Sequence, residues 1–211
     1  MQAELRERLI LEDGIPGDIR IVAGADVSCA RGDDRVYAAV VLLDAESLEV
    51  VEEAVYCGRT SFPYIPGLLS FREGPALLRA FGRLRNRPDA VLFDGQGIAH
   101  PRGFGLAAHL GLILDVPAVG CAKTRLIGSH AEPGARRGES SPLVHDGRVI
   151  GAVLRTKDRV RPVFVSQGHR VSLEGAVELV LRCARRYRIP EPIRRAHILV
   201  NRIRRQMAGD G

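Results

Sequence analysis

Residues 20–59 read RIVAGADVSCARGDDRVYAAVVLLDAESLEVVEEAVYCGR, and this stretch decides the fold. Its β-branched and small residues predict a strand over Arg20–Ala30, and a continuous apolar run predicts a second over Val36–Leu43. A third strand is expected at Val50–Arg59. Since only short turns separate the three strands, the stretch predicts an antiparallel meander.

The hydrophobic pattern then changes to alternating helices and strands. Ser70 and Glu73 have the S-x-x-E spacing of a capping box, which predicts a helix over about Phe71–Leu84. A short buried strand, a helix and another strand are expected to follow, at Ala90–Phe93, about Leu106–Leu114 and Val116–Ala122. Alternation of this kind requires crossover connections and parallel pairing.

The remainder predicts a polar surface loop, two strands and two helices. In chain order these are the loop Ser129–Asp146, a hairpin of Val149–Arg155 and Val163–Ser166, and helices at about Leu173–Arg186 and Pro192–Gln206. The fold class is therefore α/β: a ribonuclease H-like mixed sheet, three antiparallel strands and then α/β crossovers, flanked by helices. No linker separates two cores, so we expect one domain over residues 1–211.

Composition excludes several classes of protein. With 211 residues, 45% apolar and 27% charged, the chain can bury a proper core and is not disordered. It holds no run of about 20 apolar residues and no signal-peptide pattern, so we expect a soluble, cytoplasmic protein without a membrane partner. Four widely spaced cysteines without a C-x-x-C pair indicate reduced thiols rather than a zinc site. The net charge of +6 admits a polyanionic partner.

Two aspartates occupy positions that favour chemistry. Asp26 lies within an apolar strand, where a carboxylate is rarely buried unless it is paired or holds a metal. The alternative is that the strand bulges or ends early and leaves Asp26 in water. Asp94 ends the strand Ala90–Phe93 and opens the glycine-rich DGQGIAHPRGFG, at the strand end where ligands gather in open sheets. The alternative for Asp94 is a plain helix N-cap.

Further charged residues complete a candidate site. Glu73, on a nearby helix, would add a third carboxylate to a cluster of hard oxygen ligands, which suits Mg²⁺. Lys123, one of only two lysines in the chain, ends the next strand and would serve a developing phosphate charge, or would simply be solvated. His197 lies in a helix rich in arginine, and it could equally be structural.

The loop Thr60–Gly67, TSFPYIPG, is stiff because prolines bracket an aromatic and a branched apolar residue. Rigid apolar tips of this kind act as wedges that unstack bases. The alternative is a loop that packs Phe62 and Ile65 onto the core.

Taken in order, five segments resemble the endonuclease V family of inosine-directed repair nucleases. They are VAGADVS, FPYIPGLLSFREGP, PDAVLFDGQGIAHPRGFG, GCAKTRLIG and IPEPIRRAHILV, which run from about Ile21 to Arg204. The resemblance implies an Mg²⁺-dependent endonuclease, with Mn²⁺ as a substitute. It implies a nick at the second phosphodiester bond 3′ to deoxyinosine, leaving 3′-hydroxyl and 5′-phosphate ends.

The resemblance also implies roles for individual residues. Asp26 and Asp94 would bind the metal, Glu73 and His197 would lie beside it, and Lys123 would contact the cleaved backbone. The wedge would be Pro63, Tyr64, Ile65 and Pro66. Backbone near five further residues would line a pocket for the base: Gly67, Leu69, Gly95, Leu106 and Leu126.

The expected partner is DNA that contains deoxyinosine or another deaminated base, bound by a monomer. Two other functions stay open at this point. A nuclease of the same fold could prefer inosine-containing RNA, or flapped and branched DNA. A non-catalytic module could bind the lesion and recruit other repair factors.

Overall fold

The computed structural model describes residues 2–29, 34–63, 65 and 67–209, without the side chains of Ala3 and Ala208. All its strands join one open sheet of eight, in the order β3-β2-β1-β4-β5-β8-β7-β6. The strands are β1 Ile21–Cys29, β2 Arg35–Asp44, β3 Val50–Arg59, β4 Ala90–Phe93, β5 Ala118–Ala122, β6 Ser140–His145, β7 Arg148–Leu154 and β8 Val163–His169. The helices are α1 Gln2–Arg6, α2 Leu69–Phe81, α3 Leu106–Leu114, α4 Leu173–Cys183 and α5 Glu191–Gly209.

Strand directions follow the predicted plan. The strands β1, β2 and β3 pair antiparallel, and β4 then adds parallel to β1 and β5 parallel to β4. The remaining strands, β8, β7 and β6, continue the sheet antiparallel. The predicted class, a mixed sheet flanked by helices, is confirmed, and so is the hairpin of β7 and β8.

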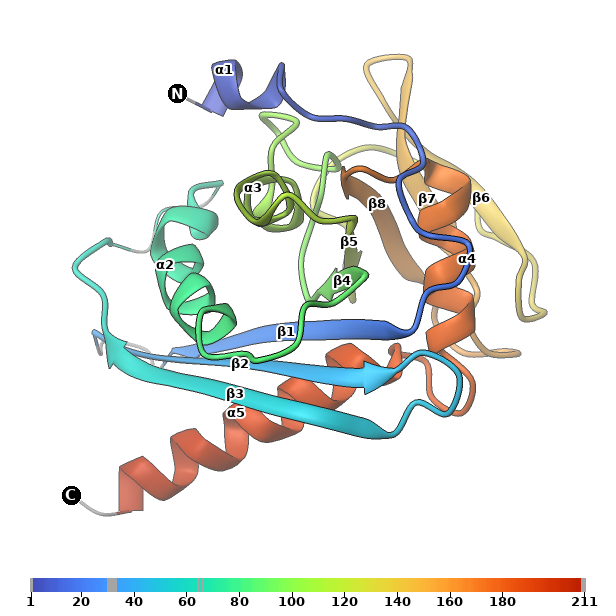
Figure 1. Ribbon diagram of the computed structural model, residues 1–211. Coiled ribbons are helices and arrows are strands. Elements are labelled where there is room, and N and C mark those ends of the chain that lie inside the picture. Colours follow the sequence, from blue (N-terminus) through green and yellow to red (C-terminus); the bar gives the residue numbers. More distant parts are fainter. Residues whose placement is uncertain (1, 30–33, 64, 66, 210–211) are drawn as a thin grey trace.

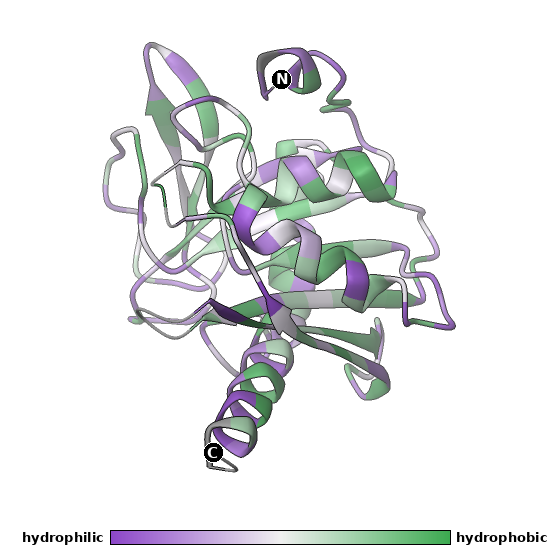
Figure 2. Cartoon of the chain, turned by 90° about the vertical axis from the view of Figure 1, so that its left-hand side faces the viewer, coloured by the Kyte–Doolittle hydropathy of each residue, from purple (hydrophilic) through white to green (hydrophobic). Residues whose placement is uncertain are grey.

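Helices cover both faces of the sheet (Figure 1). On one face α2 and α3 pack through Leu77 and Leu110 against Ala25 and Phe93. On the other face α4 and α5 pack through Leu179 and other apolar residues. Figure 2 shows the matching pattern along α5, where apolar and polar bands alternate. The central strands of the sheet are therefore buried on both faces.

A small residue decides how closely α5 approaches β1. A Cβ atom built on Gly24 would lie 2.0 Å from the carbonyl of Pro192, so only glycine fits there. Side chains alternate along a strand, so Asp26 points to the same face as Gly24. The contact at Gly24 thus brings the first turns of α5, which carry His197, against Asp26.

Four predicted features are corrected by the structure. The segment Ser129–Asp146 is not wholly a loop, because β6 forms within it and pairs with β7. The helix α2 begins at Leu69, and its N-cap residue Leu68 makes no side-chain cap. The predicted capping box is therefore wrong, and Ser70 lies buried inside the helix. The helix α4 ends at Cys183 rather than Arg186, and α1 was not predicted.

Two findings bear on the class of protein. Among the described residues, no helix is long and apolar enough to cross a bilayer. None of the four cysteines forms a disulfide.

Candidate active site

The site lies at the carboxyl end of β4, beside the second half of β1. These parallel strands pair with Ala25 opposite Phe93, so the next residues, Asp26 and Asp94, are neighbours across the sheet. The backbone N–H of Asp94 donates to the Ala25 carbonyl at 3.2 Å and fixes this register. Asp94 does not cap α3, whose N-cap is Gly105, so the helix-cap alternative is wrong.

Asp26 is buried and held from two sides. Its Oδ1 accepts a hydrogen bond from the Val27 N–H at 2.8 Å, and a second hydrogen bond of 2.6 Å joins its Oδ2 to His197 Nδ1. Only 9% of Asp26 is exposed, which excludes a solvated bulge. Burial raises the pKa of its carboxyl and the nearby charge of Asp94 raises it further, while the bond from His197 opposes the shift.

Asp26, Asp94 and His197 can converge on one ion. One ligand atom from each residue lies within 4.8 Å of the others. Carboxylate oxygens and an imidazole nitrogen suit a divalent cation, and such a cation would relieve the repulsion that raises the pKa of Asp26. The donor set therefore fits a divalent metal.

Lys123 reaches the same group from the end of β5. Its Nζ lies 2.5 Å from Asp94 Oδ2, and the lysine side chain is 39% exposed. It is thus neither buried nor simply solvated: its ammonium group is paired with Asp94, and its side chain is partly exposed.

Glu73 approaches from α2, on the opposite face of the sheet from α5. It is not part of the group that can share one ion, but it lies close enough to sense both aspartates. Burial and the charge of Asp26 raise the pKa of Glu73 to about 8. The carboxyl is therefore largely protonated at neutral pH when no cation is bound.

Glu73→Gln is expected to stabilise the metal-free protein at high pH. Because the folded-state pKa lies above the unfolded value of 4.5, folding binds a proton between these pH values, and wild-type stability falls as pH rises from about 4.5 to 8. The substitution should raise the free energy of unfolding by up to about 4 kcal/mol at pH 8 and should have no such effect below pH 4.5. Urea unfolding in EDTA at several pH values measures it.

Glu178→Gln, on the exposed face of α4, is the matched control and should leave the pH dependence unchanged. Equal pH profiles for wild type and Glu73→Gln would show that Glu73 is not held in a site that suppresses its charge.

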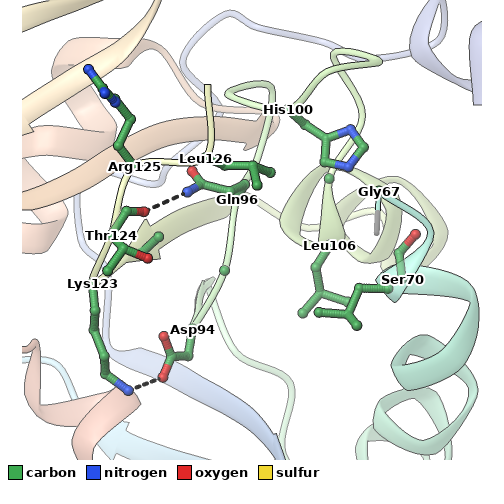
Figure 3. Close-up of a pocket in the computed structure, with 14 residues that line it drawn as sticks. Gly67, Ser70, Asp94, Gln96, His100, Leu106, Lys123, Thr124, Arg125 and Leu126 are labelled. Carbon is green, nitrogen blue, oxygen red and sulfur yellow. Dashed lines mark hydrogen bonds and ion pairs between the residues drawn. The ribbon is translucent and has the colours of Figure 1, made fainter. Parts of the chain in front are cut away.

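A cavity of about 370 Å³ opens beside Asp94 (Figure 3). Asp94 and Lys123 line one end of it. All five residues predicted to form a base pocket also line it: Gly67, Leu69, Gly95, Leu106 and Leu126. Leu69 and Leu126 are 37% and 52% exposed, so the rim is apolar and uncovered, as expected of a surface that receives a ligand.

Sequence reasoning missed several polar residues that line this cavity, among them Gln96, His100 and Arg125. His100 is buried, and its Nδ1 accepts a hydrogen bond from the Arg102 N–H at 3.2 Å. Burial lowers the pKa of His100, which favours the neutral ring. Gln96 and His100 belong to the segment DGQGIAHPR, in which sequence reasoning considered only the aspartate and the glycines. Their closeness to Asp94 in the sequence could have indicated a place in the site.

The structure describes two of the four residues of the predicted wedge, Pro63 and Ile65. Phe62 packs back onto the body, stacking on Phe71 at 5.9 Å between ring centroids, while Arg72 Nη1 donates to the Phe62 carbonyl at 2.5 Å. Pro63 is exposed and Ile65 is 40% exposed. The alternative of a loop packed onto the core thus holds for Phe62 and not for Ile65. Tyr64 and Pro66 lie outside the described residues.

The sequence profile of Endonuclease V matches residues 3–198. The chain belongs to the Endonuclease V family. An Endonuclease V of Azotobacter vinelandii is 54% identical over 202 residues, which are 96% of this chain and 91% of that protein. Members of the family are metal-dependent endonucleases, hydrolases of DNA phosphodiester bonds, and this protein is one of them.

Solved structures agree with the assignment. The crystal structure of Endonuclease V from Streptomyces avermitilis superposes with a TM-score of 0.94 at 47% identity, covering 98% of this chain and 91% of that one. Endonuclease V of Ciona intestinalis, solved in complex with a 24mer DNA containing an inosine followed by a ribo-adenosine, gives 0.85 at 28% identity, covering 98% and 95%. The predicted ribonuclease H-like fold is thereby confirmed.

Proposed function

We propose that this endonuclease recognises deoxyinosine in DNA and hydrolyses the second phosphodiester bond 3′ to it, with Mg²⁺ as cofactor and Mn²⁺ as a substitute. The observation that carries the proposal is the position of the base-sized cavity directly beside Asp94 and Lys123. One pocket thus joins a place for an extruded base to the carboxylates. The inosine-containing DNA bound by the Ciona intestinalis relative supports the choice of lesion.

The carboxylates would hold the cation. Asp26 and Asp94 are the ligands we propose, with His197 beside them and Glu73 near enough to add its charge. Bound Mg²⁺ would supply Lewis-acid stabilisation of the phosphate charge and lower the pKa of the attacking water. Because Val27 and His197 both hold the Asp26 carboxylate, little reorganisation is needed when the ion enters.

Lys123 would move from its partner to the substrate. In the free protein its ammonium group pairs with Asp94. With a cation held by Asp26 and Asp94, the ammonium group would be free to stabilise charge on the cleaved phosphate or the departing 3′-oxygen.

The base would enter the cavity from the helical stack. A deaminated adenine pairs poorly and therefore costs less to extrude than a normal base. The segment Pro63–Pro66, anchored at Phe62, would fill the gap that the base leaves. Glycines at Gly67 and Gly95 leave main-chain groups accessible at the wall, and a tight wall would exclude guanine, which carries an added exocyclic amine.

A labelled duplex with a single deoxyinosine tests this function. We expect a nick on the inosine strand, one nucleotide beyond the lesion on its 3′ side, in Mg²⁺ or Mn²⁺ and none in EDTA or on a plain duplex. Binding in Mg²⁺ without any nick would favour a lesion-binding module. A parallel arm uses RNA of the same sequence with inosine, and faster cleavage there would favour the ribonuclease function.

A further inference from the structure

Lys123 lies at the point where the pairing of its strand ends. The last pair between β5 and β8 is Ala122 with Phe164, and residues 124–126, beyond Lys123, are exposed. Figure 3 nevertheless shows the Lys123 side chain turned toward Asp94, with which it pairs. The backbone that carries this ammonium group therefore has to be held by groups from outside the strand ladder.

One such group is the guanidinium of Arg188, in the loop between α4 and α5. Its Nη2 donates to the Lys123 carbonyl and to the Pro162 carbonyl, both at 2.8 Å. Pro162 comes directly before β8, which is the neighbour of β5 in the sheet. One nitrogen with two hydrogens thus joins the end of β5 to the beginning of β8 at the position of Lys123.

The rest of the Arg188 guanidinium indicates that these two carbonyls set its position. Its Nε is buried and makes no hydrogen bond to any part of the chain that the structure describes. Since a buried donor without a partner is costly, the guanidinium is not placed there to satisfy all of its own donors. Burial lowers the pKa of Arg188, but a guanidinium stays charged at neutral pH, and a charged donor binds a carbonyl more strongly than a neutral one.

The loop that carries Arg188 has supports other than the guanidinium. Thr156, which is only 2% exposed, donates from its Oγ1 to the Arg188 carbonyl at 2.6 Å. Farther along the chain, the close contact between Gly24 and Pro192 holds the start of α5 against β1. Because the loop is anchored in these ways, the guanidinium offers a fixed point from which the Lys123 backbone can be held.

We propose that Arg188 is a positioning residue, whose bond to the Lys123 carbonyl fixes the backbone from which the ammonium group reaches the cleaved phosphate. The proposal rests on the function proposed above, in which Lys123 stabilises charge on that phosphate. A shift of the Lys123 backbone would move the ammonium group with it. A misplacement of about 1 Å at a reacting centre can cost about 10²-fold in rate, so a support of this kind bears directly on turnover.

A double-mutant cycle of Arg188 and Lys123 tests the proposal. Arg188→Met keeps an unbranched side chain without the guanidinium, and we expect it to lower single-turnover nicking of the inosine duplex about tenfold, with DNA affinity in EDTA near the wild-type level. In the Lys123→Met background the same substitution should change the rate by less than about twofold, because no ammonium group is left to be positioned. A merely structural arginine would cost the same factor in both backgrounds.

Two further variants complete the cycle. Arg188→Lys keeps the charge and a donor group on a shorter side chain, and it provides the same comparison if the methionine variant fails to fold. We expect from it a smaller loss that also disappears in the Lys123→Met background. Arg137→Met is the matched control for the lost charge. Arg137 is exposed, its Nη2 donates to the Leu181 carbonyl in α4 at 2.6 Å, and it does not line the cavity, so this variant should nick at the wild-type rate.

Equal losses in the two backgrounds would overturn the proposal, because Arg188 would then support the fold or another group of the site. A wild-type rate in the Arg188 variants, a loss that consists only of weaker DNA binding, or an equal loss in Arg137→Met would overturn it as well. A wild-type rate in Lys123→Met would remove the role of Lys123 and the proposal with it. Failure of the proposed function looks different, since the wild-type protein itself would not nick the inosine duplex.

Discussion

Asp94→Asn should reduce nicking of an inosine duplex on the order of 10³-fold while binding in EDTA stays near the wild-type level. The amide keeps the size of the carboxylate but offers one neutral oxygen where the proposed ion needs a charged ligand. It also replaces the charged partner of Lys123 Nζ with a neutral one, so the ammonium group is held less firmly beside the metal site. Asp26→Asn should lose activity to a similar degree, because it removes the other proposed ligand. Single-turnover rates and gel-shift titrations on one duplex separate the two effects.

Asp146→Asn is a suitable control for the lost charge. Asp146 is 86% exposed in the turn between β6 and β7, and its φ of 48° is a conformation that asparagine tolerates. The substitution Asp146→Asn changes the net charge by the same amount as Asp94→Asn, but at a position far along the chain from the site. Near-normal turnover in both active-site variants would refute the metal site, and an equal loss in Asp146→Asn would point to bulk charge.

Lys123→Met should lower single-turnover nicking by about 10²-fold with little loss of DNA affinity. The proposed role of Lys123 is to stabilise charge that develops in the transition state, and methionine keeps the aliphatic stem without the ammonium group. Removing Lys123 leaves Asp94 free to bind the cation, so the Mg²⁺ concentration for half-maximal activity should not rise. A rise in that concentration with an unchanged maximal rate would show that Lys123 acts on the metal site rather than on the phosphate.

The chain offers a close control for this substitution. Lys157 is its only other lysine, is exposed, and donates to the Arg186 carbonyl at 3.3 Å. Lys157→Met should nick at the wild-type rate. If both variants lose activity alike, the effect of Lys123→Met is caused by a weaker general electrostatic attraction between the protein and DNA.

Much of the fold was predictable because its apolar runs are clear. The strand Ala90–Phe93 and the helix Leu106–Leu114 have the predicted bounds, since the strand is wholly buried, the helix is buried over its first six residues, and each is followed by an aspartate. The edge strand β6 escaped prediction for the opposite reason. It pairs with a strand on one side only, and only Ser141 and Leu143 are buried in it, too few to show an alternating pattern.

Helix ends were harder to predict. Ser70 and Glu73 have the spacing of a capping box, but Ser70 is buried within α2 and Glu73 is turned toward the carboxylates. The N-cap preference of serine was overridden by tertiary contacts. The predicted end of α4 at Arg186 was too late, because the chain leaves the helix after Cys183 to bring Arg188 against the Lys123 carbonyl.

The candidate site was predictable in its residues but not in its geometry. A carboxylate within an apolar strand pointed to Asp26, and the end of a strand pointed to Asp94. Their pairing depends on the register of β1 and β4, and the place of His197 depends on the close approach at Gly24.

A crystal soaked in Mn²⁺ and measured at the manganese absorption edge tests the central claim most directly. The account predicts an anomalous peak bound by carboxylate oxygens of Asp26 and Asp94, with His197 next to it and the peak lost in Asp94→Asn. Carboxylates that stay unliganded while Mn²⁺ binds elsewhere, or that turn away from each other, would contradict it.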